Sequence, residues 1–194
     1  MKVLSLMLLA LVAWAPEVSA HIGEGEAAGL FAGLRHPVSG LDHVLAMIAV
    51  GLWGAQLGAP ALWQLPVAFP MVMALGGVLG LLGVPLPGVE VGIAASAVLL
   101  GLAVMFALRP PLAVAVIVVG LFGIFHGHAH GTELPPGESA LLYSLGFVVA
   151  TGCLHGLGIA AGLTHRWRWG QSMLRTAGVI VAVGGVFYLW KAVA

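Results

Sequence analysis

The sequence has little charge and almost no cysteine. Asp, Glu, Lys and Arg make up 7% of its 194 residues, against roughly 25% in an ordinary soluble domain, and hydrophobic residues make up 61%. Seven basic residues balance seven acidic ones, so no net charge points to nucleic acid or to an acidic partner. The single cysteine, Cys153, excludes an intramolecular disulfide framework and any multi-cysteine zinc or iron–sulfur site. The composition is typical of a membrane protein, and the presence of eight histidines in such an apolar chain requires an explanation.

The first twenty residues have the pattern of a secretory signal peptide. Lys2 supplies the charged start, an apolar run extends from Val3 to Ala15, and Val18-Ser19-Ala20 is a small-residue cleavage site. The alternative is an uncleaved first helix, for which the apolar run is short. We expect cleavage after Ala20, which places the new N-terminus, His21, on the outer side of the membrane.

Six further apolar segments are long enough to cross a hydrocarbon core that needs roughly 20 helical residues. Several are joined by only a few residues, so consecutive helices must be antiparallel neighbours in one bundle. The sequence therefore predicts an all-α membrane protein: a signal peptide over residues 1–20 and a single compact six-span domain over 21–194. The predicted spans are 39–56, 61–83, 89–108, 112–129, 139–163 and 172–190.

The charges support one orientation. An outer N-terminus places Arg109 and the Arg166, Arg168 and Arg175 group in the cytoplasm, in agreement with the positive-inside rule. The same orientation places Glu90 and Glu133 outside. We expect a multi-pass protein of the bacterial inner membrane with a periplasmic mature N-terminus.

Glycine and proline predict how the helices pack. Small residues four apart let helices approach closely, either within one chain or in a homodimer. Pro66 and Pro70 interrupt the second predicted span and leave carbonyl groups without donors, which favours a broken or kinked helix beside a pathway. The glycine pairs at this spacing include Gly54/Gly58, Gly76/Gly80, Gly123/Gly127, Gly152/Gly156 and Gly158/Gly162.

The first candidate metal-binding motif lies at the outer mouth of the first span. It contains His36, Asp42 and His43. Pro37 favours an extended conformation for His36, which would fold this histidine back over the helix mouth. The structural alternative is a capping box formed by Ser39 and Asp42, which would explain Asp42 without a metal.

The second motif lies at the outer end of the fourth span. Three histidines within five residues, His126, His128 and His130, are followed by Glu133. His126 and His130 share one helix face, as paired histidines do in helical metal sites, whereas His128 points the other way. A single histidine at this position would be explained as an interfacial residue, but three histidines within five residues favour metal ligation.

Both motifs fall at outer ends of helices in one small bundle, so their side chains can meet. Imidazole and carboxylate without thiolate suit Ni²⁺, Co²⁺ or Zn²⁺ better than Cu(I), and the nitrogen content argues against Mg²⁺ or Ca²⁺. Glu90 opens the third span on the same side and is a further candidate ligand. Its structural alternative is a carboxylate that interacts with the helix dipole.

Two more histidines are conditional candidates. His155 lies deep in the fifth predicted span, where it is either a second station on a pathway, a proton acceptor, or a core histidine bonded to a helix carbonyl. His21 would chelate metal through its imidazole and free α-amine if cleavage follows Ala20. Cys153, two residues before His155, is interpreted as a packing residue.

At these residues the sequence resembles the HupE/UreJ family of nickel permeases. The resemblance rests on His36 with five residues before Asp42-His43, and on the run from Phe125 to Glu133, and it extends over the whole chain. The resemblance implies nickel uptake without an ATPase subunit, with some relatives linked to cobalt. It also implies important roles for His36, Asp42, His43, Phe69, Glu90, His126, His130 and Glu133.

The function predicted from the sequence is therefore a secondary permease rather than an enzyme. Ni²⁺ or Co²⁺ would be the transported ion, with no catalytic cofactor, and the partners would be the metal ion, the lipid bilayer and, in a homo-oligomer, a second copy. No nucleotide-binding loop of the Walker type is present, so the driving force would come from the metal gradient, the membrane potential or protons. The alternative from another class is an intramembrane zinc-dependent hydrolase, in which the same side chains hold Zn²⁺ that activates water.

Overall fold

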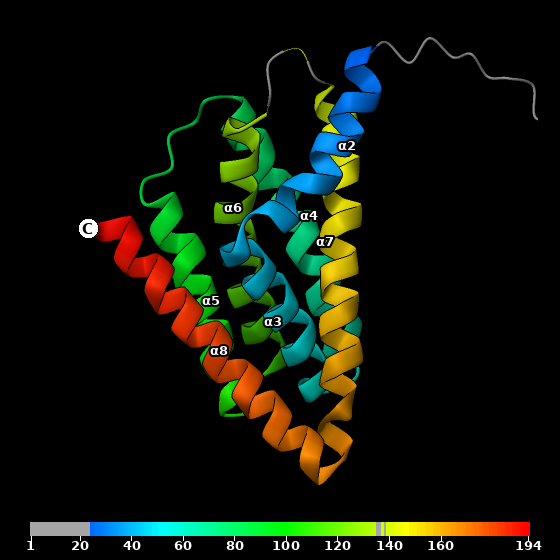
Figure 1. The fold of residues 1–194 in the computed structure, drawn as a ribbon, viewed down its shortest axis with the longest axis vertical. Helices are drawn as coiled ribbons and strands as arrows, with labels where there is room; N and C mark the ends of the chain where they lie inside the picture. The colour runs from blue at the N-terminus through cyan, green and yellow to red at the C-terminus, as the bar shows by residue number, and fades with distance from the viewer. Residues whose placement is uncertain (1–23, 135–136, 138) are drawn as a thin grey trace, which may run out of the picture.

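A computed structural model describes residues 24–134, 137 and 139–194, with side chains from residue 29 onward (Figure 1). The predicted signal peptide and His21 lie outside the described residues. The described chain is helical, which confirms the predicted all-α class. Its elements are α2 (Glu24–Ser39), α3 (Leu41–Leu57), α4 (Ala61–Leu81), α5 (Val89–Met105), α6 (Leu112–Thr132), α7 (Ala140–Gly162), the 3₁₀ helix η1 (Leu163–Arg166) and α8 (Arg168–Val193).

The described helices form a multi-pass membrane bundle. Four are long and apolar enough to cross a membrane: α4, α6, α7 continued through η1, and α8. The bent pair of Gly29–Ser39 and α3 supplies a fifth candidate span. Helix α5 is apolar but shorter, with 17 residues. By length and composition the described residues thus provide four or five spans, and the predicted six would also require α5 to cross.

Helix α2 was not predicted from the sequence, and it changes how the first motif is built. The expectation that Pro37 makes His36 extended is wrong, because both residues lie in the last turn of α2. A proline in the last turn of a helix removes only one backbone hydrogen bond near the end of that helix. Packing of α2 along α7 supports the helix, since Gly33 lies against the backbone of Tyr143 on α7. The chain instead turns at Gly40, where α2 and α3 meet at 81°.

The predicted capping box does not form. Gly40 is the N-cap of α3, and it provides no side-chain cap. Ser39 Oγ donates a hydrogen bond back to the His36 carbonyl at 2.7 Å, and an oxygen of Asp42 accepts from the backbone N–H of His43 at 2.9 Å. The structural explanation of Asp42 as a cap is therefore wrong, and its carboxylate is available to the side chain of His43.

Helix α4 runs unbroken through Pro66 and Pro70, so the predicted break is absent. Close packing against α6 holds the helix together: Gly76 and Gly80 lie against backbone carbonyls of Ile124 and His128. In the other direction, Gly123 and Gly127 of α6 lie against carbonyls of α4. The prediction of close helix packing through glycine pairs is confirmed here.

The glycine pairs of α7 behave differently from one another. Gly158 and Gly162 pack against the backbone of α3, whereas a Cβ at Gly152 or Gly156 would meet no described heavy atom within 4 Å. Helix α3 lies at the centre and contacts α4, α5, α7 and α8, while α5 pairs with α8.

The two ends of the bundle differ in their side chains. One end, here called the arginine end, contains the turn from α7 into α8 (Figure 1). There Arg109, His165 and Arg175 line a pocket of about 200 Å³, and the rings of Trp167 and Trp169 stack at 5.5 Å. The opposite end, where α6 finishes and α7 begins, contains both histidine motifs and is called the histidine end.

Candidate metal centre

A series of imidazole rings runs from the histidine end into the bundle. The ring centroids of His36 and His130 are 4.7 Å apart, those of His130 and His43 are 4.5 Å apart, and those of His43 and His126 are 4.7 Å apart. These rings come from α2, α6 and α3. The structure therefore brings together the two motifs that lie far apart in the sequence.

Two local features make the rings converge. The bend at Gly40 brings the end of α2, which carries His36, close to the start of α3, where His43 lies in the first turn. His126 and His130 are one turn apart on α6, so their side chains point in the same direction. His126 is fully buried and His130 is 5% exposed, which places the two rings of α6 out of reach of water.

The outer group consists of His36, His130 and Glu133. One ligand atom from each of the three lies within 4.8 Å of the other two. The Nε2 atom of His36 is 2.9 Å from Oε2 of Glu133, and Nδ1 of His130 is 3.9 Å from the same oxygen. The hydrogen bond from His36 holds the pKa of Glu133 below its ordinary value, although partial burial opposes this shift. Glu133 is thus held as a carboxylate, the form that ligates cations.

The inner group consists of His43 and His126, and Asp42 stands behind the first of them. Nδ1 of His43 is 3.1 Å from Oδ1 of Asp42. A carboxylate accepts, so this contact places the ring proton on Nδ1 and leaves the lone pair on Nε2. Nε2 of His43 is buried and has no hydrogen-bond partner among the described residues. The arrangement is that of a metal-ligating histidine oriented by a carboxylate.

Behind His126 stands Ser96, a residue that no sequence motif indicated. Its Oγ lies 2.9 Å from Nε2 of His126, and the serine is fully buried in α5. The available signal was a single hydroxyl in the apolar run from Ile93 to Leu100. Its partner lies thirty residues away in the sequence, so only the packing of α5 against α6 reveals the contact.

The ring series continues inward through Phe69 to His155. Phe69 is fully buried, with its ring centroid 5.3 Å from that of His126 and 5.5 Å from that of His155. His155 faces the carbonyl of Pro66, although neither ring nitrogen reaches hydrogen-bond geometry. That carbonyl lacks its helical donor because Pro70 has no N–H. The two prolines thus leave a polar atom beside the deepest histidine.

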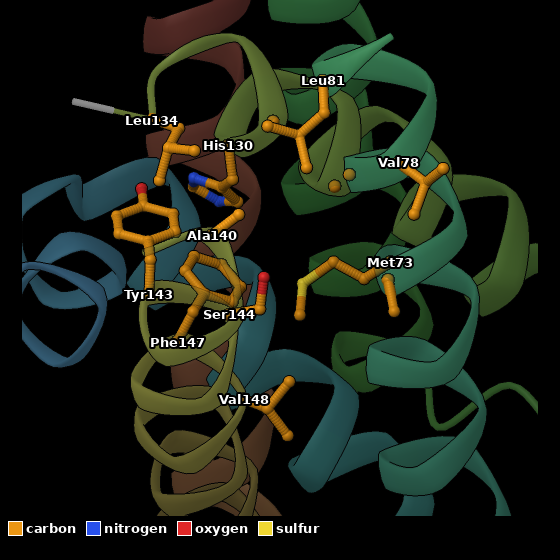
Figure 2. A pocket seen from close by; sticks show the side chains of 14 residues that line it. Met73, Val78, Leu81, His130, Leu134, Ala140, Tyr143, Ser144, Phe147 and Val148 are labelled. Carbon is orange, nitrogen blue, oxygen red and sulfur yellow. The ribbon is translucent and has the colours of Figure 1, made fainter. Parts of the chain in front are cut away.

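A cavity of about 160 Å³ borders His130 from the side, between α4, α6 and α7. Figure 2 shows the His130 ring above Phe147 and beside Tyr143, with Met73, Val78 and Leu81 of α4 across the cavity. The centroids of His130 and Phe147 are 4.0 Å apart. The lining is mainly apolar, so one side of the imidazole series faces a small space without charged groups.

Other predicted site residues lie apart from this series. His128 is turned toward the connection between α4 and α5, where Nε2 donates to the Val84 carbonyl at 2.7 Å. Glu90 is exposed in the first turn of α5. Cys153, which was interpreted as a packing residue and not as a ligand, is instead exposed on α7. The structure therefore groups His36, Asp42, His43, His126, His130 and Glu133, with Phe69 and His155 following inward.

Comparisons with known proteins identify the family of the chain. The model of the family described as HupE / UreJ protein matches residues 9–188. Protein HupE of Rhizobium leguminosarum bv. viciae is 50% identical over 170 residues, which cover 88% of each chain. Among solved structures, none gives a significant match. The extent of both sequence matches shows that the chain belongs to the HupE/UreJ family.

Proposed function

We propose that this protein is a secondary permease that takes up a divalent transition metal across the bacterial inner membrane, with Ni²⁺ as the preferred ion. The observation that carries the proposal is the series of converging imidazoles, several of whose buried nitrogens have no hydrogen-bond partner among the described residues. These are His43 Nε2, His126 Nδ1, and both ring nitrogens of His130 and His155. Membership in a family generally associated with nickel and cobalt transport supports it.

The unpartnered nitrogens favour a ligand over a purely structural role. Leaving a buried polar group without a hydrogen bond costs about 1–3 kcal/mol. A cluster that was only structural would be expected to satisfy more of these atoms. His128, outside the series, donates from Nε2 to the Val84 carbonyl and leaves only Nδ1 without a partner, whereas His130 and His155 leave both ring nitrogens without one among the described residues. A metal ion accepts the one lone pair that each neutral imidazole carries and removes that part of the cost.

The chemistry of the donors selects the class of metal. Neutral imidazole with carboxylate oxygen suits Ni²⁺, Co²⁺ and Zn²⁺, and geometry decides among them. Cys153, the one thiol of the chain, is exposed on α7 and separate from the rings. We assign Ni²⁺ as the preferred substrate and Co²⁺ uptake by the same route as the alternative.

In the proposed route the outer group captures the ion and the inner group receives it. Glu133 supplies negative charge where the site is half-exposed, and His130 contacts rings of both groups. From His126 the ion passes Phe69 and reaches His155 beside the Pro66 carbonyl. The remaining step leads toward the arginine end of the bundle.

The proposal includes a topology. The signal peptide is removed, helices α3 to α8 make six crossings, and the histidine end faces the periplasm. The arginines then lie in the cytoplasm, as the positive-inside rule requires. A membrane potential, negative inside, would favour inward movement by about 2.3 kcal/mol per charge per 100 mV.

The cavity beside His130 is the observation that would favour an intramembrane zinc hydrolase instead. Pockets for small organic ligands measure roughly 300–1,000 Å³. The cavity of about 160 Å³ is smaller, which supports transport of an ion over cleavage of a lipid or peptide.

The decisive experiment is uptake of Ni²⁺, Co²⁺ and Zn²⁺ at trace concentration into cells that lack their own high-affinity nickel transport. We expect expression of this chain to raise Ni²⁺ accumulation most, and His130→Ala to return it to background. Cys153→Ser is the control, since the thiol is exposed away from the rings. Equal accumulation in wild type and His130→Ala would contradict the proposal.

A further inference from the structure

Ser96 occupies a position where one hydroxyl serves two partners. Its Oγ lies 2.6 Å from the carbonyl oxygen of Ile93, one turn earlier in α5, and 2.9 Å from Nε2 of His126 on α6. The side chain is fully buried. Water therefore does not compete for either contact.

The single hydroxyl proton decides the direction of both hydrogen bonds. A carbonyl oxygen only accepts, so the 2.6 Å approach to Ile93 requires the serine proton to lie between the two oxygens. Ser96 Oγ must then accept at the second contact, and Nε2 of His126 must carry its ring proton. In a neutral imidazole the other nitrogen, Nδ1, is left with the lone pair.

That lone pair is the one the proposed site needs. Nδ1 of His126 is buried without a hydrogen-bond partner among the described residues. The His126 ring contacts His43, whose Nε2 is also unpartnered. Metal-binding histidines usually donate their second ring N–H to a carboxylate, a carbonyl or water, and that partner fixes the tautomer and the ring orientation.

We propose that Ser96 is a positioning residue for metal binding, which fixes His126 as the tautomer that presents Nδ1 to the ion. The inference rests on the proposed function and deepens it. Ser96 serves His126 as Asp42 serves His43, but through a neutral hydroxyl that adds no charge.

A purely structural role would look different. Thr132 and Thr164 also donate to the carbonyl three residues earlier, at 2.7 Å and 2.6 Å, as Ser96 does. That bond alone accounts for a hydroxyl inside a helix. At Ser96 the hydroxyl makes the same bond and holds an imidazole as well.

The test uses the full-length protein in detergent and compares wild type, Ser96→Ala and Thr164→Ala. Thr164→Ala is the matched control, because it removes a hydroxyl bonded to the carbonyl three residues earlier at the arginine end. Nitrogen-15 NMR of labelled histidine reads the ring tautomer without metal, and calorimetric titration with Ni²⁺ reads affinity. The His126 signal is assigned from its loss in His126→Asn.

We expect wild type and Thr164→Ala to show the Nε2–H tautomer at His126, and Ser96→Ala to lose that preference. Loss of a group that orients a ligand typically weakens metal affinity about 10- to 100-fold, and we expect the lower part of this range for a neutral partner. Thr164→Ala should bind Ni²⁺ as wild type does.

The two proposals fail in different ways. If wild type binds Ni²⁺ and Ser96→Ala matches it in affinity and tautomer, the inference about Ser96 is overturned while the proposed function stands. Equal weakening in Thr164→Ala would also overturn it, since the loss would then reflect general destabilisation. If wild type does not bind Ni²⁺, the proposed function fails, and the tautomer measured without metal still decides whether Ser96 sets the proton of His126.

Discussion

The outer and inner groups contain the same kind of ligand but are built differently. In the outer group the carboxylate of Glu133 stands beside the imidazoles and is itself a candidate ligand, with its side chain 52% exposed. In the inner group the polar partners stand behind the imidazoles: Asp42 holds His43, and Ser96 holds His126.

Because of this difference, we expect the two groups to perform different steps: the outer group captures the ion, and the inner group selects among ions. An exposed carboxylate can move and accept an ion that keeps part of its water, whereas oriented and buried imidazoles offer fixed directions to an ion that has lost it. Selectivity among divalent metals depends on such geometry more than on donor type. We therefore expect the outer group to determine how fast ions enter and the inner group to determine which ions pass.

The largest expected effect comes from removing the ring that joins the groups. His43 contacts both His130 and His126, so His43→Ala should abolish Ni²⁺ uptake and lower affinity in detergent more than about 100-fold. His128→Ala is the control from the second motif, because this ring is held by Val84 outside the series. Uptake measured at trace Ni²⁺ checks both, and normal uptake in His43→Ala would contradict a single connected route.

The second largest effect is expected from the contact between α4 and α6, which positions the histidines of α6. A Cβ at Gly127 would overlap the Met73 carbonyl, so Gly127→Ala should push α6 away from α4 and destabilise the bundle by about 1–3 kcal/mol. Gly156→Ala is the matched control, since its added methyl would meet no described heavy atom. Thermal unfolding in detergent measures the difference, and equal stability of the two variants would refute the close contact between α4 and α6.

A smaller effect is expected from Asp42→Asn. The amide still accepts from Nδ1 of His43 but removes the negative charge, so Ni²⁺ affinity should fall about ten-fold with little loss of stability. Because Asp42 orients a ring of the inner group, we also expect the selectivity for Ni²⁺ over Zn²⁺ to change in this variant. Glu133→Gln should instead slow uptake and leave selectivity unchanged. Calorimetric titration with each metal, together with initial uptake rates, distinguishes the two outcomes.

The smallest expected effect is the pH dependence of the outer group. The pKa of Glu133 lies below its ordinary value of 4.5 because His36 donates to the carboxylate. The contact therefore contributes stability above pH 4.5, and this contribution is lost as the pH falls through the lowered pKa. Between pH 6 and a pH below the lowered pKa of Glu133, wild type should lose more thermal stability than Glu133→Gln does. An equal loss in both would show that the contact adds no stability.

The sequence identified the chemical groups of the site but not the contacts that orient them. Histidine spacing on α6 was enough to predict that His126 and His130 share a face, because helical periodicity is local. The His126–Ser96 contact depends on how α5 packs against α6, which spacing cannot reveal. The route of His36 to the site was also mispredicted. The local preference imposed by Pro37 was overridden by packing of α2 on α7, and the turn came at Gly40.

The paired prolines of α4 have an electrostatic consequence for the proposed transport. The self-energy of an ion in a medium of low dielectric constant rises with the square of its charge, so a dication meets a steep barrier near the middle of a bilayer. A carbonyl without a helical donor carries partial negative charge and adds no net charge of its own. At Pro66 such a dipole lies beside the buried ring of His155. Helix α4 would thus lower the barrier at one point of the route without adding a charged side chain.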